Sequence, residues 1–333
     1  MISKSFARKK FPVKEFVSVL FPLAFIILLV AFPDKYLGSC KKGLSLWALT
    51  VLPSLLPFFF LTALLTSSGA LFKISDKFTG VTSFLFRQNG VSAYGFIMSV
   101  LSGYPVGSRI VCDLYSSEII GKDDAARMSV LCTTSGPLFI VGAVGIAMFH
   151  SEKAGFFIYF SHILAAFANG IIFRGYGSYK KTTANLPALS VKENVLYESM
   201  YGSVISALIV GGFISVFYVF SDVASDFYML FPLEFLLKII LFPFKASPYV
   251  IKAVAAGLIE CTKGAFLLSE TGLSPLTVSL SAALCSFGGI SVIMQSLVFL
   301  EKAKVKKRVF LSGKVLQTII SFALCYLLTS FFL

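Results

Sequence analysis

The stretch Ser102-Gly103-Tyr104-Pro105-Val106-Gly107-Ser108-Arg109 decides the fold. Two apolar arms flank it, Val91–Leu101 and Val106–Tyr115, and each would form a helix of roughly 15 Å, about half of a hydrocarbon core. The proline disfavours helix at the tyrosine before it, and the two glycines permit a sharp turn. We therefore predict a re-entrant hairpin whose tip is half of a binding site, because irregular backbone is tolerated at membrane depth only beside protein or a water-filled cavity.

The composition is that of a polytopic helical membrane protein with a lipid bilayer around it. Of the 333 residues, 57% are hydrophobic and only 14% are charged, too few charges for a soluble surface. The net charge of +13 is concentrated in a few loops, which suits the positive-inside rule and not a nucleic-acid partner. The six cysteines lack metal-binding spacing, and no phosphate loop, dinucleotide fingerprint or nucleophile elbow is present, so we predict no metal, no cofactor and no enzyme activity.

The first unit, residues 1–42, combines a basic N-terminus, predicted to be cytoplasmic, with a spanning anchor at Phe16–Phe32 and a short outer loop that runs to Lys42. The second unit, residues 43–174, holds a spanning helix, an amphipathic interfacial segment at Leu71–Arg87 and the first hairpin. A solvated loop from Glu118 to Arg127 follows. The next crossing is Met128–Phe149, with an interruption at Thr133–Pro137, and a further spanning helix completes the unit.

Residues 175–199 form a polar linker that we place in the cytoplasm, and residues 200–333 repeat the plan of the second unit. The predicted elements are a spanning helix, an interfacial helix at Phe231–Phe244, a second re-entrant hairpin at Pro248–Leu268 and a crossing at Pro275–Leu300 interrupted at Ser286–Ser291. A strongly basic loop, Glu301–Lys314, then precedes a last spanning helix.

The repeats at residues 43–174 and 200–333 each cross the membrane three times. Residues 200–333 therefore enter the membrane with the opposite orientation. The predicted fold is an all-α polytopic membrane protein built as an inverted repeat, with two re-entrant helical hairpins, two interrupted transmembrane helices and two interfacial helices. Inverted repeats with broken helices at mid-membrane are typical of secondary transporters, whose site lies where the repeats meet.

Four strings lie at the hairpin tips and helix breaks: Leu101–Gly107, Ser135–Ile140, Gly257–Gly264 and Phe287–Val292. From about residue 44 onward, their order and spacing resemble the bacterial sporulation integral membrane proteins of the YlbJ / stage V type, which carry nucleoside-recognition Gate domains. The Gate architecture is also similar to that of concentrative nucleoside transporters. The resemblance implies movement of dipicolinic acid from the mother cell towards the spore, through the outer forespore membrane.

The candidate substrate-binding residues lie at the two hairpin tips and the two helix breaks. Arg109 suits a carboxylate, but Asp113 is an equally ready partner. Glu260 and Lys263 have two interpretations. Either they form a mutual salt bridge, or Glu260 is a proton or cation site and Lys263 is a second binding partner for a substrate carboxylate. His150 and His162 are interpreted as interfacial or packing residues. The full candidate set is Ser102, Gly103, Tyr104, Arg109, Ser135, Gly136, Glu260, Thr262, Lys263, Gly288, Gly289 and Ser291.

The broken helices at Gly136 and at Gly288-Gly289 would expose N–H groups that hold an anion, and the serines could add hydrogen bonds or bond back to their own helices. The leading hypothesis is a secondary transporter of a small aromatic dicarboxylate, coupled to H⁺, to Na⁺ or to neither. Nucleoside transport and a non-transporting spore-envelope assembly protein are the alternatives, and a homo-oligomer is left open.

Overall fold

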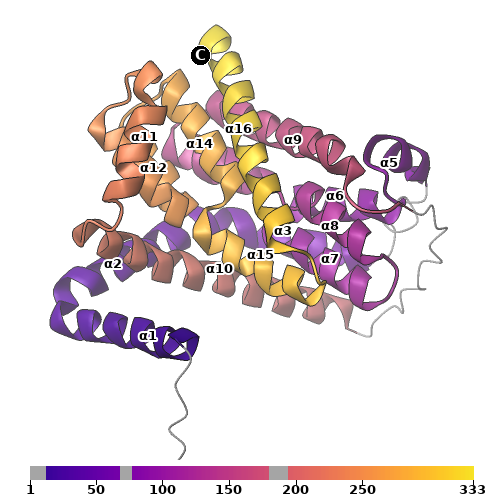
Figure 1. The fold of residues 1–333 in the computed structure, drawn as a ribbon, viewed down its shortest axis with the longest axis horizontal. Helices are drawn as coiled ribbons and strands as arrows, with labels where there is room; N and C mark the ends of the chain where they lie inside the picture. The colour runs from indigo at the N-terminus through magenta and orange to yellow at the C-terminus, as the bar shows by residue number, and fades with distance from the viewer. Residues whose placement is uncertain (1–12, 68–76, 180–193) are drawn as a thin grey trace, which may run out of the picture.

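The computed structural model describes residues 13–67, 77–179 and 194–333, and over these residues the protein is helical without strands (Figure 1). In this part of the chain, five helices are long and apolar enough to cross a membrane. The protein is therefore an all-α polytopic membrane protein. The five candidate spans are Pro33–Leu65, Glu152–Gly175, Val195–Asp226, Pro275–Lys302 and Lys307–Phe332.

The N-terminal helices differ from the predicted boundaries. Helix α1 (Val13–Ala31) is followed directly by α2 (Pro33–Leu46), which continues through the π-turn η1 (Trp47–Val51) into α3 (Leu52–Ser67). The predicted outer loop before residue 43 is thus wrong, because Pro33 opens a helix there, a position that proline favours. The described apolar part of α1 is too short to count among the five candidate spans, so a crossing by Phe16–Phe32 stays a prediction.

The two halves of the chain contain the same elements in the same order. Each begins with a long helix, continues with a short helix and a helical hairpin, and ends with an interrupted helix and a second long helix. In the first half these are α3, α5 (Thr79–Phe86), α6 (Val91–Ser102), α7 (Val106–Ser116), α8 (Lys122–Leu131), η2 (Leu138–Met148) and α9 (Glu152–Ile172), followed by the 3-10 turn η3 (Phe173–Gly175). In the second half they are α10 (Val195–Asp226), α11 (Phe231–Ile240) with the 3-10 turn η4 (Phe242–Phe244), α12 (Pro248–Ile259), α13 (Cys261–Glu270), α14 (Pro275–Phe287), α15 (Gly289–Lys302) and α16 (Lys307–Phe332).

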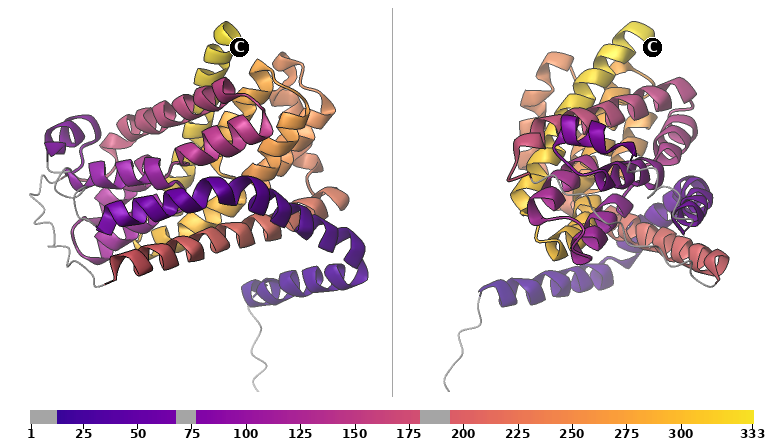
Figure 2. Two further views of the ribbon diagram at one scale, coloured as in Figure 1. Left: turned by 180° about the vertical axis from the view of Figure 1, so that it is seen from behind. Right: turned by 90° about the vertical axis from the view of Figure 1, so that its right-hand side faces the viewer.

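Corresponding long helices of the two halves pack against each other. Helix α3 lies along α10 (Figure 2), and α9 packs against α16. Small residues allow close approach at the contact of α2 and α10, since a Cβ atom at Gly43 would lie 2.9 Å from the Cα atom of Ser215. One apolar core joins η1, α3, η2, α9, α10 and α12–α14, so the centre of the molecule is shared by both halves.

Several helix starts follow from the local sequence. Ser151, Ser247 and Ser274 each place a hydroxyl on a backbone N–H three residues later, at the first turns of α9, α12 and α14. Pro248 and Pro275 stand just after two of these caps, where a missing N–H costs nothing.

Two predicted loops are shorter than expected. Residues 122–127 belong to α8, and Arg127 is buried and paired with Asp124, so a solvated loop there is wrong. Helix α16 begins at Lys307, so the basic connection is only four residues long, Ala303–Lys306, and Lys314 lies inside a helix. In the predicted interfacial segment Leu71–Arg87, residues 71–76 lie outside the described residues, and α5 is its helical part.

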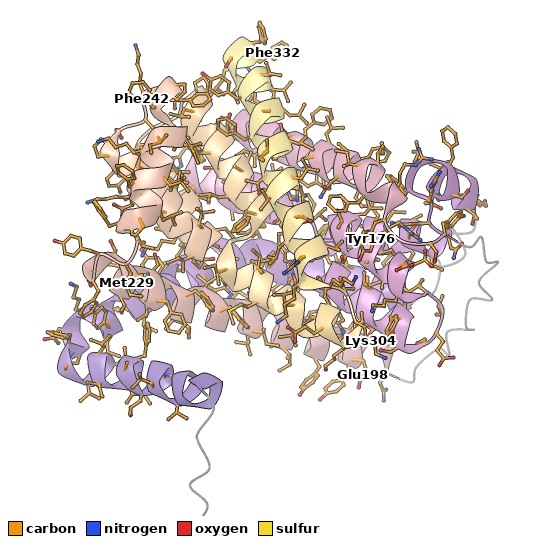
Figure 3. The ribbon with its side chains drawn as sticks, in the orientation of Figure 1. Tyr176, Glu198, Met229, Phe242, Lys304 and Phe332 are labelled. Carbon is orange, nitrogen blue, oxygen red and sulfur yellow. The ribbon has the colours of Figure 1, made fainter. Side chains whose placement is uncertain are left out.

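Figure 3 shows Tyr176, Glu198 and Lys304 at the right-hand end of the molecule, whereas Met229 and Phe242 lie at the left and Phe332 lies at the top. The start and end of the predicted cytoplasmic linker and the second basic connection therefore share one end. This arrangement agrees with placing both connections on the same side of the membrane.

Candidate functional site

The first hairpin turns where the sequence predicted. Helix α6 ends at Ser102, Gly103 has a φ of +75°, and α7 begins at Val106. The positive φ explains the glycine, because a side chain would be strained there. A Cβ atom at Gly103 would also lie 2.6 Å from the backbone nitrogen of Gly136, so the first tip rests directly on the break between α8 and η2.

The second hairpin turns at a single extended residue, Glu260, between α12 and α13. Its carboxylate accepts a hydrogen bond of 2.7 Å from the backbone N–H of Lys263 and so caps α13. This tip also rests on the break of its own half, because a Cβ atom at Gly289 would lie 2.9 Å from the carbonyl oxygen of Ile259. Gly288 and Gly289, with φ values of +85° and +69°, separate α14 from α15.

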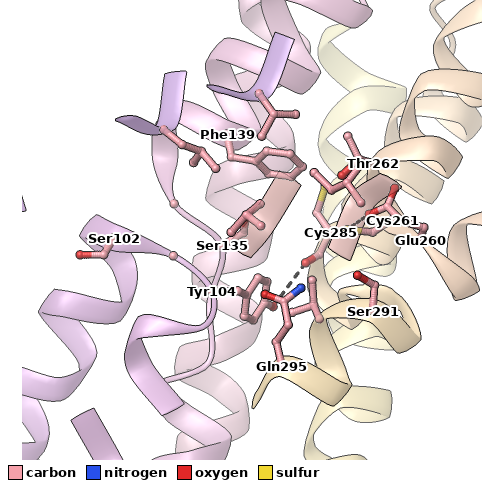
Figure 4. A pocket seen from close by; sticks show the side chains of 17 residues that line it. Ser102, Tyr104, Ser135, Phe139, Glu260, Cys261, Thr262, Cys285, Ser291 and Gln295 are labelled. Carbon is pink, nitrogen blue, oxygen red and sulfur yellow. Dashed lines mark hydrogen bonds between the residues drawn. The ribbon is translucent and has the colours of Figure 1, made fainter. Parts of the chain in front are cut away.

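The two tips and the two breaks meet around one cavity of about 50 Å³, shown in Figure 4. Such a volume holds a few water molecules, whereas sites for organic ligands usually measure about 300–1,000 Å³. The cavity is lined by residues of both halves: Val51, Leu55, Ser102, Gly103, Tyr104, Ser135, Gly136, Phe139, Val210, Ile214, Glu260, Cys261, Thr262, Cys285, Ser291, Val292 and Gln295.

Eight of the twelve predicted residues line this cavity, although substrate contact by any of them stays a prediction. Tyr104 points across it and donates its hydroxyl to the carbonyl oxygens of Cys285 and Ser286, at 3.3 and 3.2 Å. The Ser102 side chain points away from the other labelled residues (Figure 4). The eight residues are Ser102, Gly103, Tyr104, Ser135, Gly136, Glu260, Thr262 and Ser291.

Ser291 lines the cavity with a hydroxyl that has an unused hydrogen-bonding capacity. It is buried, it lies on α15 at the edge of the cavity, and its hydroxyl has no hydrogen-bond partner among the described residues. A buried hydroxyl without a partner is costly unless something else satisfies it. This hydroxyl could therefore bond to a ligand in the cavity.

Four predicted residues do not line the cavity. The Arg109 side chain is 64% exposed and lies 3.8 Å from the Asp113 carboxylate, so its predicted ion pair forms, but away from the cavity. Gly288 and Gly289 shape the second break without facing the cavity.

Lys263 is buried, and of the two interpretations offered for Glu260 and Lys263, the mutual salt bridge is wrong. The ammonium lies 2.7 Å from the Asp222 carboxylate and 2.9 Å from the Ser221 hydroxyl. Glu260 contacts Lys263 through the backbone N–H of that residue and not through its ammonium. The Glu260 carboxylate faces the start of α13, where it also accepts from the Cys261 thiol at 4.0 Å.

His162 joins the two helix breaks and was not predicted to do so. On α9 it is fully buried; Nε2 accepts the Ser135 N–H at 2.9 Å, and Nδ1 lies 2.7 Å from the Ser286 hydroxyl. Because a backbone N–H can only donate, Nε2 is unprotonated and the proton of the neutral ring lies on Nδ1. The available signal was an ionisable residue inside an apolar spanning segment.

Lys314 is the second residue that sequence reasoning misplaced. Its ammonium lies 2.6 Å from the Tyr104 hydroxyl, 3.1 Å from the Thr133 carbonyl oxygen and 3.3 Å from Gln317 Oε1. These partners belong to the first hairpin tip, the first helix break and α16 itself. The side chain is 1% exposed, so a cation lies at the centre of the molecule, behind the ring of Tyr104.

Comparison with known proteins found one relevant similarity. The chain is 28% identical over 310 residues to the sporulation integral membrane protein YlbJ of Bacillus subtilis (strain 168). The matched region covers 86% of this chain and 76% of that protein. No protein-family model matches the chain. No solved structure is significantly similar to it. This similarity extends over most of the chain and agrees with the resemblance found in the four strings, so the protein is a multi-pass membrane protein similar to the YlbJ-type sporulation integral membrane proteins.

Proposed function

We propose that the protein is a secondary-type transporter of a small aromatic dicarboxylate, dipicolinic acid, across the outer forespore membrane during sporulation. The observation that carries this proposal is the meeting of both hairpin tips and both helix breaks at one cavity. In secondary transporters, discontinuous helices from two repeats build the substrate site near the middle of the bilayer.

The relative's name supports a role in sporulation, and the choice of dipicolinic acid follows from the family resemblance. The helical membrane architecture supports a non-enzymatic role. The cavity of about 50 Å³ is too small for a dicarboxylate, so transport requires the hairpins to move away from the breaks. The substrate would then meet the free hydroxyl of Ser291 and the backbone of the two breaks.

Flux into liposomes tests the proposal. The purified protein is reconstituted, dipicolinate is supplied on one side, and uptake is measured with and without a pH or sodium gradient. We expect saturable uptake, and for Ser291→Ala a KM raised about three- to tenfold, because one hydrogen bond is lost. Ser312→Ala is the matched control, since this exposed hydroxyl bonds only to the Val309 carbonyl of its own helix.

The alternatives give different results in the same assay. Uridine uptake without dipicolinate uptake would support nucleoside transport. Folded protein that moves neither compound would contradict transport of both substrates and leave an assembly role in the spore envelope.

A further inference from the structure

A buried lysine without an acidic partner lies beside the cavity. Lys314 donates to three neutral oxygens, and no carboxylate lies within 4 Å of its ammonium among residues 13–67, 77–179 and 194–333. The other buried basic side chains in the described residues each have an acidic partner: Lys263 is paired with Asp222, and Arg127 is paired with Asp124. Neutral oxygens satisfy the N–H groups of Lys314 but leave the positive charge of its protonated form uncompensated.

The groups that face this ammonium from the neighbouring elements supply no negative charge. Tyr104 comes from the first hairpin, Thr133 from the first break, Gln317 from α16, and His162 from α9 in its neutral form. Cys261, a thiol, is the nearby titratable group of α13. Among the described residues that line the cavity, the acid is Glu260, and it turns its carboxylate towards the start of α13.

The Tyr104 side chain separates this charge from the cavity. Its ring centroid lies 4.5 Å from the ammonium, and its hydroxyl donates to the Cys285 and Ser286 carbonyls of the second break while accepting from Lys314. The cavity has to enlarge before a ring with two carboxylates fits. Movement of the first tip away from the second break enlarges it and uncovers the ammonium.

We infer that Lys314 is the residue that recognises the negative charge of the substrate, a carboxylate of which replaces the Tyr104 hydroxyl on its ammonium. This inference rests on the proposed function, since it names the specificity residue of the same site. When the carboxylate binds to Lys314, the first hairpin therefore loses its contact with this lysine in the same step. A neutral molecule of the same shape gains no such contact.

The test compares two probes that share a ring but differ in charge, dipicolinate and pyridine-2,6-dicarboxamide. In proteoliposomes, Lys314→Gln should lower dipicolinate uptake about tenfold or more and leave diamide uptake unchanged. Lys302→Gln, which removes the same charge from an exposed position, should behave as the wild type. Wild-type dipicolinate uptake by folded Lys314→Gln overturns the inference.

Tyr104→Phe keeps the test decisive if Lys314→Gln does not fold. Loss of the hydroxyl removes the group that competes with the substrate for the ammonium, so the KM for dipicolinate should fall about threefold or more, with the diamide KM unchanged. Equal KM values for Tyr104→Phe and wild type contradict the inference.

A readout without transport separates this inference from the proposed function. Cys261 and Cys285 line the cavity, so their alkylation by N-ethylmaleimide, followed by peptide mass spectrometry, reports opening. Dipicolinate, and not the diamide, should increase this labelling in wild type but not in Lys314→Gln. Charge-dependent labelling without dipicolinate flux would reject transport and retain the anion site. If wild type shows neither this labelling nor dipicolinate flux, the anion site and the proposed transport are both rejected.

Discussion

The imidazole of His162 lies 2.7 Å from the hydroxyl of Ser286, a residue 124 positions further along the chain. Through its other nitrogen the ring accepts the N–H of Ser135, so one side chain fastens the broken helices of both halves to each other. His162→Ala should therefore leave two buried groups without partners and destabilise the protein by about 3 kcal/mol. Thermal unfolding of the purified protein measures this.

His162→Gln should recover part of the lost stability, because its amide both accepts and donates. His150→Gln is the control, since His150 is exposed, and its melting temperature should stay within about 1–2 °C of wild type. A His162→Ala protein as stable as this control would show that the bridge between the breaks contributes little.

The hairpins and breaks could be predicted because their signals are local. Val91–Leu101 was predicted as the first arm and α6 is Val91–Ser102, since Gly103 and Pro105 end and restart a helix in any surroundings. His162 and Lys314 could not be placed in this way. Their partners, Ser286 and Tyr104, lie 124 and 210 positions away, and no local pattern encodes that contact.

Lys314 also shows how a charge pattern misleads. The basic run ending at Arg308 favoured a loop as far as residue 314, but α16 starts inside that run and carries Lys314 about two turns into the apolar region. The six residues between Lys307 and Lys314 are mostly apolar or small, which was the available hint.

The ion pair of Lys263 and Asp222 should be structural. Asp222→Asn leaves a buried ammonium with reduced compensation and should cost about 2 kcal/mol, less than for a fully buried pair because the Asp222 side chain is 29% exposed. Lys263→Met added to Asp222→Asn should recover at least half of that loss. A double-mutant cycle from thermal unfolding measures the coupling, and additive losses would contradict the pair.

The contact of the second tip with its break predicts a steric effect. Gly289→Ala should destabilise the protein by about 2 kcal/mol or more, because the residue has a φ of +69° and the new Cβ atom would lie 2.9 Å from the Ile259 carbonyl oxygen. Gly212→Ala in α10 is the matched control. It meets nothing within 4 Å, so it should be neutral or slightly stabilising, since alanine favours a helix. Melting temperatures of both variants, purified in parallel, decide between these outcomes.

Substitution of Arg109, the cation next to the first turn, tests whether this residue acts on the substrate, as the sequence suggested. In the structure its side chain is 64% exposed and its ion pair with Asp113 is long, at 3.8 Å. Exposed pairs of this kind contribute about 0–1 kcal/mol, so Arg109→Ala should change the melting temperature little and leave the KM for dipicolinate within about twofold of wild type. Loss of uptake in Arg109→Ala, with Lys314→Gln unaffected, would instead return the anion site to the first hairpin and require this arginine to reach the cavity in another conformation.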